Sequence, residues 1–279
     1  MLRRLSLAFA ALLLTAASAI AQQAPSASLT FWYDYTVRPG READFLNLVK
    51  AIGEPVRDKL MAEGVVQAWG LEVPMLRTGG GTHTIWYAVN DFAGVEKVQN
   101  AMAAQIAKIA ADEAAKKAPK GTTTAERTLE VLDVSKTRDY LTRDLVSNFG
   151  TTLPPAGTLP YTYFASVKVR PGKGADYRRA WEKYNKPVLD KLVADGTVLA
   201  FGLAVEAVKT TGDFTHFTWV ATKDLASRDK VRAAQLANQG SQSEETRAAI
   251  TAQFVETIDS DASRQGIARS LIFKVAGQK

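Results

Sequence analysis

The sequence predicts an α+β protein built from two tandem copies of one unit. Three observations support this class: a long internal repeat, short alternating segments rich in aromatic and β-branched residues, and amphipathic helical patterns between them. The 279 residues are 46% hydrophobic and 23% charged, as in soluble globular proteins. A chain of this length is long enough for two domains that each bury a core.

The internal repeat is the strongest of these patterns. Val37-Arg38-Pro39-Gly40 recurs as Val169-Arg170-Pro171-Gly172, at an offset of 132 residues. Of the 37 residue pairs that this register aligns from Val37 onward, 18 are identical. One inserted residue later, Thr82-His83 matches Thr215-His216. Agreement over this length indicates a duplication.

Each copy is expected to follow the order β-α-β-β-α-β. A first strand passes through an Arg-Pro-Gly turn into a helix whose apolar residues recur every three or four positions. Two strands come next, followed by an alanine-rich helix with an aspartate N-cap and by a final strand. The strands are expected at residues 31–37, 65–73, 82–89 and 127–134, and at 163–169, 197–205, 215–222 and 268–275.

This order is the ferredoxin-like order, and it divides the chain. Residues 28–135 form repeat 1, residues 136–160 form a linker that contains Leu153-Pro154-Pro155, and residues 161–275 form repeat 2. A unit of this size, with a Pro-Gly turn between strand one and helix one, resembles the dimeric α/β-barrel superfamily. That group includes cofactor-free monooxygenases, haem-degrading enzymes, EthD-like proteins and NIPSNAP-like proteins. The resemblance lies in the layout and implies that the two repeats pack as one pseudo-dimeric α/β barrel.

Residues 1–21 are expected to be a signal peptide. Arg3 and Arg4 precede a short apolar run, and Ala19-Ile20-Ala21 supplies a small-x-small cleavage site. The protein should therefore be exported, to the periplasm or the cell exterior. An uncleaved N-terminal anchor is the alternative. The run is too short to span a bilayer comfortably, so no stable membrane insertion is expected after cleavage.

The amino-acid composition excludes several kinds of functional site and makes one class of partner unexpected. Cysteine is absent, which excludes disulfides, thiolate metal ligands and a cysteine nucleophile. Without Arg3 and Arg4 the chain has 33 basic and 29 acidic residues, a net charge of +4. These charges are mixed along the chain and form no basic stripe, so nucleic acid is not expected as a partner.

Strand parity predicts an aromatic-lined barrel interior, because alternate residues of a strand face opposite sides. The small Ala68 and Gly70 are expected to face helices. An interior with many aromatic and few polar groups suits a small apolar or amphipathic molecule. Aromatic side chains that merely fill the barrel are the alternative. The expected ligand-binding residues are Trp32, Asp34, Thr36, Trp69, Phe164, Ser166, Lys168 and Phe201.

The two histidines, His83 and His216, occupy equivalent places in the two copies. Imidazole transfers protons near neutral pH, so both are candidate catalytic groups. A structural role beside a turn is the alternative. Trp86 and Trp219 lie on the opposite strand face from the histidines, and parity leaves open which face points inward. Two imidazoles are too few for a usual zinc site, and no metal site is predicted.

We therefore expect an exported small-molecule-binding protein. A cofactor-independent monooxygenase or haem-handling enzyme that uses a strand histidine is one alternative, and a structural or interaction module without a site is another. No cofactor is predicted, although haem stays open. Catalysis and homo-oligomerisation also stay open at this stage.

Overall fold

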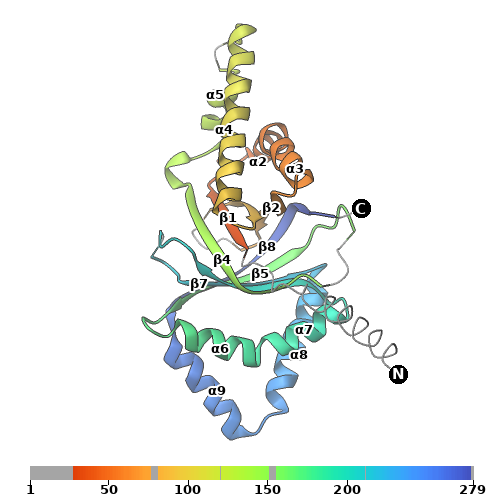
Figure 1. Cartoon of the computed structure of the whole chain (residues 1–279), viewed down its shortest axis with the longest axis vertical. Coiled ribbons are helices and arrows are strands. Elements are labelled where there is room, and N and C mark those ends of the chain that lie inside the picture. Colours follow the sequence, from red (N-terminus) through yellow and green to blue (C-terminus); the bar gives the residue numbers. More distant parts are fainter. Residues whose placement is uncertain (1–27, 77–80, 120, 151–154, 211, 278–279) are drawn as a thin grey trace, which may run out of the picture.

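The computed structural model describes residues 28–76, 81–119, 121–150, 155–210 and 212–277. The expected signal peptide lies outside these residues. The described chain is a mixed α+β fold, in which antiparallel strands form a closed eight-stranded barrel (Figure 1). The strand order around the barrel is β1-β3-β2-β8-β5-β7-β6-β4. Helices α2–α5 cover one side of the barrel, and helices α6–α9 cover the opposite side.

The strands and α-helices follow the same order in the two halves of the chain. The first half contains β1 (Leu29–Tyr35), α2 (Glu42–Leu48), the π-helical turn η1 (Val49–Gly53), α3 (Glu54–Ala62), β2 (Val66–Pro74), β3 (His83–Val89), α4 (Phe92–Ala115), α5 (Thr124–Val131), the 3₁₀ turn η2 (Val134–Lys136) and β4 (Arg138–Asn148). The second half contains β5 (Tyr161–Val169), α6 (Gly174–Tyr184), α7 (Lys186–Ala194), β6 (Val198–Glu206), β7 (His216–Thr222), α8 (Leu225–Gly240), α9 (Glu244–Thr257) and β8 (Ile258–Val275).

The barrel closes within one chain. The first half contributes strands in the order β4-β1-β3-β2, and the second half contributes β8-β5-β7-β6. The two halves are joined by the antiparallel pairs β2–β8 and β4–β6. The last strand of each half therefore connects its own half to the second strand of the other, so neither sheet has a free edge.

The final strand of the first half differs from the prediction. Residues 127–134 were expected to form that strand, but most of this segment belongs to α5. A capping box starts the helix, with the Thr123 hydroxyl accepting from the Glu126 backbone N–H and the Glu126 carboxylate accepting from the Thr123 N–H. The true strand is β4, inside the expected linker 136–160. In the second half, β8 begins at Ile258, ten residues earlier than expected.

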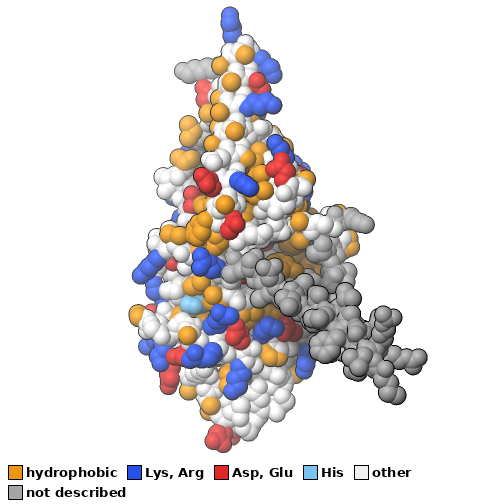
Figure 2. Space-filling model, viewed as in Figure 1, with side chains coloured by type: hydrophobic (Ala, Val, Ile, Leu, Met, Phe, Trp, Pro, Cys, Tyr) orange, Lys and Arg blue, Asp and Glu red, His pale blue; other side chains and the backbone are white. Residues whose placement is uncertain are grey.

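Aspartate side chains begin the two long helices that follow β3 and β7, as the sequence predicted. Asp91 accepts from the Gly94 N–H at 2.8 Å, and Asp224 accepts from the Ser227 N–H at 2.7 Å. Helix α4 extends well beyond the barrel (Figure 1). On the face of the molecule shown in Figure 2, basic and acidic side chains are interspersed. No helix in the described part of the chain is long and apolar enough to cross a membrane.

Hydrophobic side chains form three clusters. One lies between the first-half helices and the outer face of the barrel, and includes Trp69 and Tyr87. A second lies under the second-half helices and includes Trp181 and Phe201. The third fills part of the barrel interior and is mainly aromatic: Trp32, Trp86, Tyr140, Phe164, Ala204, Phe214, Phe217 and Trp219.

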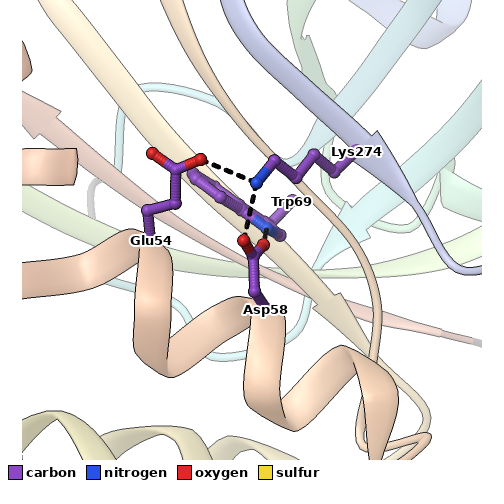
Figure 3. A network of polar contacts seen from close by, with 4 residues as sticks. All are labelled: Glu54, Asp58, Trp69 and Lys274. Atoms are coloured by element: carbon purple, nitrogen blue, oxygen red, sulfur yellow. Dashed lines mark hydrogen bonds and ion pairs between the residues drawn. The ribbon is translucent and has the colours of Figure 1, made fainter. Parts of the chain in front are cut away.

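Polar side-chain contacts connect α3 and α7 to the strand that the other half contributes. Lys274 of β8 donates to Glu54 at 2.7 Å and to Asp58 at 2.6 Å, both on α3, beside the Trp69 indole (Figure 3). The equivalent of Asp58 in α7 is Asp190, which accepts from Asn148 of β4 at 2.8 Å. These contacts hold the two helix layers against the strands that close the barrel.

Candidate small-molecule site

A cavity of about 540 Å³ opens at one mouth of the barrel. It lies where β1, β2 and β5 end and where β3, β4 and β7 begin, so residues far apart in the sequence converge on it. Aromatic, acidic and basic side chains form its wall: Trp32, Asp34, Glu72, Thr84, Arg138, Tyr140, Phe164, Ser166, Lys168, Phe214, Phe217 and Arg264, with seven further residues.

The deep wall of this cavity is a continuous aromatic surface. Trp32 stacks on Tyr140, with ring centroids 5.9 Å apart, and meets Phe217 edge-on at 5.1 Å. Phe217 in turn stacks on Phe164 at 5.9 Å. The Trp32 indole N–H donates to the Thr142 hydroxyl at 2.9 Å, which fixes the ring and satisfies its polar atom. The result is a rigid apolar surface against which a flat ligand can stack.

Glycines make room for these large rings. Gly70 lies opposite Trp86 across the β2–β3 pair, and Gly202 lies opposite Trp219 across β6–β7. A Cβ atom on Gly70 would come within 2.9 Å of the Trp86 ring, and one on Gly202 within 2.6 Å of Trp219. The small residues of β2 and β6 therefore face the barrel interior, because the tryptophans of the neighbouring strands occupy the space above them.

This arrangement corrects the prediction for the second strands. Trp69 and Phe201 were expected to face inward, but both pack under helices. The Trp69 N–H donates to Asp58 of α3 at 3.1 Å, and Phe201 contacts Trp181 of α6. A register shift between Val66 and Ala68 adds to the error, because it changes the parity of β2 near its start.

Two carboxyl groups flank one threonine at the cavity wall. Asp34 and Glu72 are the cross-strand partners of Thr84, one on each side. The Thr84 hydroxyl donates to Asp34 at 2.7 Å, and the Thr162 hydroxyl of β5 donates to Glu72 at 2.8 Å. Glu72 is only 6% exposed, although it contacts the cavity.

Burial controls the protonation of these groups. Desolvation raises the pKa of Glu72 to about 7, and the negative charge of Asp34 contributes to the rise. Desolvation also raises the pKa of Asp34, although the Thr84 hydrogen bond opposes this. The Trp86 indole lies near enough to lower the pKa of Glu72, but its N–H makes no hydrogen bond of ordinary geometry. Glu72 can therefore exchange a proton near neutral pH.

Basic side chains surround the cavity entrance. Arg138, Lys168 and Arg264 all line it. Arg138 pairs with Asp213 at 2.9 Å, and the Lys168 ammonium donates to the Gly212 carbonyl. The entrance therefore attracts anions, whereas the interior is aromatic and carries titratable carboxyls.

Five of the eight predicted ligand-binding residues line this cavity: Trp32, Asp34, Phe164, Ser166 and Lys168. Thr36 lies beyond the end of β1 and is not among the lining residues. Trp69 and Phe201 are on the outer face, as described above. Four lining residues were not predicted from the sequence: Glu72, Thr84, Tyr140 and Phe217. Glu72 shares its strand face with Gly70, so the Gly70–Trp86 pairing was the signal that could have identified it.

Both histidines lie on the outer face of the barrel, away from this cavity. His83 packs edge-on against Phe45 of α2, with ring centroids 5.0 Å apart, and His216 packs in the same way against Tyr177 of α6. Each Nδ1 lies 3.0 Å from the hydroxyl of the preceding threonine. Burial lowers the pKa of His216 to about 4 and also lowers the pKa of His83, so both are neutral at pH 7.

A second cavity, of about 870 Å³, opens at the opposite mouth. Its buried carboxyl is Asp144, whose pKa is raised to about 6 by burial and which accepts from the Ser28 hydroxyl. Among the described residues, Phe149 is the only aromatic side chain in its wall. It lacks the stacked rings and the basic entrance of the first cavity, which we therefore take as the candidate site.

The candidate site does not fit haem. Haem iron in proteins is held by histidine, cysteine, methionine or tyrosine, and Tyr140 is the only such residue among the described ones that line the cavity. Burial raises the pKa of the Tyr140 phenol well above its ordinary value, which disfavours the phenolate that would bind iron. The described residues also contain no group of three or more His, Cys, Asp or Glu side chains able to hold a metal ion.

Comparisons with known proteins support the fold. No protein-family model and no curated protein matches the sequence. Among solved structures, the chain is similar to a proposed monooxygenase from Fusobacterium nucleatum subsp. nucleatum ATCC 25586, with a TM-score of 0.59 and 13% identity over 91% of this chain and 97% of that one. It is also similar to a proposed monooxygenase from Lactobacillus acidophilus NCFM, with a TM-score of 0.54 and 10% identity over 90% and 97%. The barrel fold implied by the resemblance is confirmed.

Proposed function

We propose that the chain is an exported protein that binds a small aromatic acid in the mouth of the barrel. A flat apolar body would stack on Trp32 and Phe164, and an acidic group would lie at the entrance near Arg138 and Lys168. The observation that carries this proposal is the cavity itself, which combines a rigid aromatic wall with a basic entrance.

The charge distribution favours an amphipathic ligand over a wholly apolar one. Glu72 and Asp34 lie in the wall beneath the entrance, and the raised pKa of Glu72 limits the negative charge inside the cavity near neutral pH. An anionic group placed at the entrance would meet cationic side chains, whereas the same group placed deeper would meet the two carboxyls. This polarity would orient the ligand with its acidic end outward.

A second candidate function is acid–base catalysis on the same ligand. Glu72 favours it, because a carboxyl with a pKa of about 7 in a cavity suits a general base. Glu72 would accept a proton from a phenol or an activated C–H bond of the bound molecule. In a cofactor-independent oxygenase such a step would precede reaction of the resulting anion with dioxygen. Glu72 replaces the histidines in this role.

The two halves of the chain are proposed to be tandem ferredoxin-like repeats that arose by duplication. The identical order of elements, the equivalent strand orders and the 18 identities in 37 positions support this. Export is proposed from residues 1–21. Sequencing the amino terminus of the protein purified from its host should give Gln22 as the first residue, whereas a terminus at Met1 would contradict cleavage.

Native mass spectrometry of the protein from its own host tests the binding function. We expect a retained small molecule that is released on denaturation and that rebinds the purified protein. Ser166→Trp, which places an indole in the cavity, should abolish rebinding, whereas Ser135→Trp at an exposed position should not. Equal rebinding by both variants would exclude this cavity as the site.

A further inference from the structure

Arg57 of α3 is the most unusual charged residue outside the candidate site. It is 3% exposed and lies between α3 and the outer face of the first-half strands, with its guanidinium carbon 5.5 Å from the centre of the Trp69 ring. Its electrostatic neighbours are mainly the phenols of Tyr33, Tyr35 and Tyr87. A buried guanidinium retains its charge at neutral pH, so it requires hydrogen-bond acceptors or a counter-charge.

The described residues do not supply these partners. Arg57 makes no hydrogen bond and no ion pair with any residue in the described part of the chain, and its Nε is fully buried without an acceptor. Asp58, the acidic residue whose charge acts on Arg57, uses Oδ2 for Lys274 and Oδ1 for the Trp69 N–H. Burial raises the pKa of Tyr33, which keeps that phenol protonated at neutral pH.

The guanidinium of Arg57 packs directly against the backbone of Gly53. Gly53 ends the π-helical turn η1, and a Cβ atom there would lie 2.2 Å from Nη1 of Arg57. π-helical turns are uncommon and occur often at functional sites. At the positions equivalent to Gly53 and Arg57, the second half has Asn185 and Leu189, and its first helices contain no π-helical turn. The feature is therefore specific to the first half.

We propose that Arg57 and the hydroxyl groups of Tyr33, Tyr35 and Tyr87 form a buried binding site for a small monovalent anion, such as chloride or formate. The guanidinium supplies several N–H donors in a fixed plane, and the phenols supply further donors. Trp69 forms one side of the site, and Gly53, where a side chain would collide with Nη1, forms another. The site is separate from the barrel cavity, whose lining does not include Arg57.

Anion-dependent thermal stability tests this proposal, because a ligand that binds the folded state raises its melting temperature. Sodium chloride or sodium formate would be exchanged for sodium gluconate, a bulky anion, at constant ionic strength. At about a hundredfold excess over the dissociation constant, the melting temperature of the wild type should rise by roughly 5 to 10 °C. Arg57→Leu, which installs the residue found at the equivalent position of the second half, should show no rise.

Lys59→Gln is the matched control, because it removes one positive charge from the exposed side of the same helix. It should respond to the anions like the wild type. If Arg57→Leu does not fold by circular dichroism, chloride-35 NMR line broadening on the wild type and on Arg57→Met replaces it. An equal response in the wild type and in the Arg57 variant, or no response of the wild type to either anion, would overturn the proposal.

Discussion

Replacement of Glu72 by glutamine should make the protein more stable at pH 8 and leave its stability nearly unchanged at pH 4. Glu72 is buried in the barrel wall, and its carboxylate accepts a hydrogen bond from Thr162. A glutamine amide has nearly the same shape, and its oxygen can accept the same bond. The substitution therefore removes the cost of burying a charge and keeps the packing.

The magnitude follows from the pKa of Glu72, which burial raises from its ordinary value of 4.5 to about 7. Below pH 4.5 the carboxyl is protonated in both the folded and the unfolded chain and contributes nothing. Between pH 4.5 and 7 the unfolded chain ionises first, so the folded state loses stability as the pH rises. At ~1.4 kcal/mol for each pH unit, the full cost above pH 7 is roughly 3 to 4 kcal/mol, which Glu72→Gln should recover.

Urea denaturation of both proteins from pH 4 to pH 9 measures this difference in the free energy of unfolding. The stability of the variant must be compared with that of the wild type at each pH, because His216 changes the free energy of unfolding with pH in the opposite direction to Glu72. The pKa of His216 is lowered to about 4, so this residue removes stability as the pH falls from 6.5 to 4. Asp144 shares the dependence of Glu72, because burial raises its pKa to about 6, and comparing the two proteins at each pH cancels the contributions of both Asp144 and His216. A constant difference at all pH values, or a less stable variant at pH 8, would refute a buried Glu72 with a raised pKa.

Three further predictions concern the scaffold and the histidines. Gly202→Ala should lower the free energy of unfolding, measured in urea, by about 1 to 3 kcal/mol, because the added Cβ would lie 2.6 Å from the Trp219 ring. Gly240→Ala is the control and should not destabilise the protein, because no atom lies within 4 Å of the added Cβ. Lys274→Met should cost about 1 kcal/mol or less in the same assay, because the ion pairs it removes are about one-third exposed; a loss of several kcal/mol would contradict this. His83→Gln and His216→Gln should leave ligand affinity unchanged in isothermal titration calorimetry, because both rings lie outside the cavity. A tenfold loss of ligand affinity in either histidine variant would show that the ligand binds outside this cavity.

Much of the fold could be predicted because its signals are local and duplicated. The turn residues, helix periodicities and aspartate N-caps recur in both halves, so the order of elements followed from the repeat. The final strand of the first half could not be predicted in this way. The β-like residues Val131 and Leu132 fall at the end of a helix that a capping box begins, and β4 lies in a segment that resembled a linker. A strand at that position depends on pairing with β6, more than 50 residues later.

The candidate site was only partly predictable, because the orientation of β2 and β6 depends on neighbouring strands. Small residues suit close packing against a helix, and they suit packing under a tryptophan from the adjacent strand equally well. Strand parity cannot distinguish these cases. Gly70 faces the interior because Trp86 covers it, and this contact reverses the expected orientation of Trp69. Glu72 lies two residues after Gly70 in β2 and therefore also faces the interior. Because the orientation of β2 was predicted the wrong way round, Glu72 was not predicted to line the cavity.

The two halves therefore share a scaffold but carry different chemistry. Asp34 and Glu72 of the first half correspond to Ser166 and Ala204 of the second, so both buried wall carboxyls come from one half. The third lining carboxyl, Asp213 of the second half, is exposed and pairs with Arg138. Lys168 of the second half lines the entrance. A symmetric barrel would bring like groups together across its axis, and paired buried carboxylates would repel each other. The buried acids lie in one half, and small or aromatic residues lie opposite them. One wall is therefore available to an aromatic ligand, and the other to proton exchange. This asymmetry favours a single site over two equivalent ones.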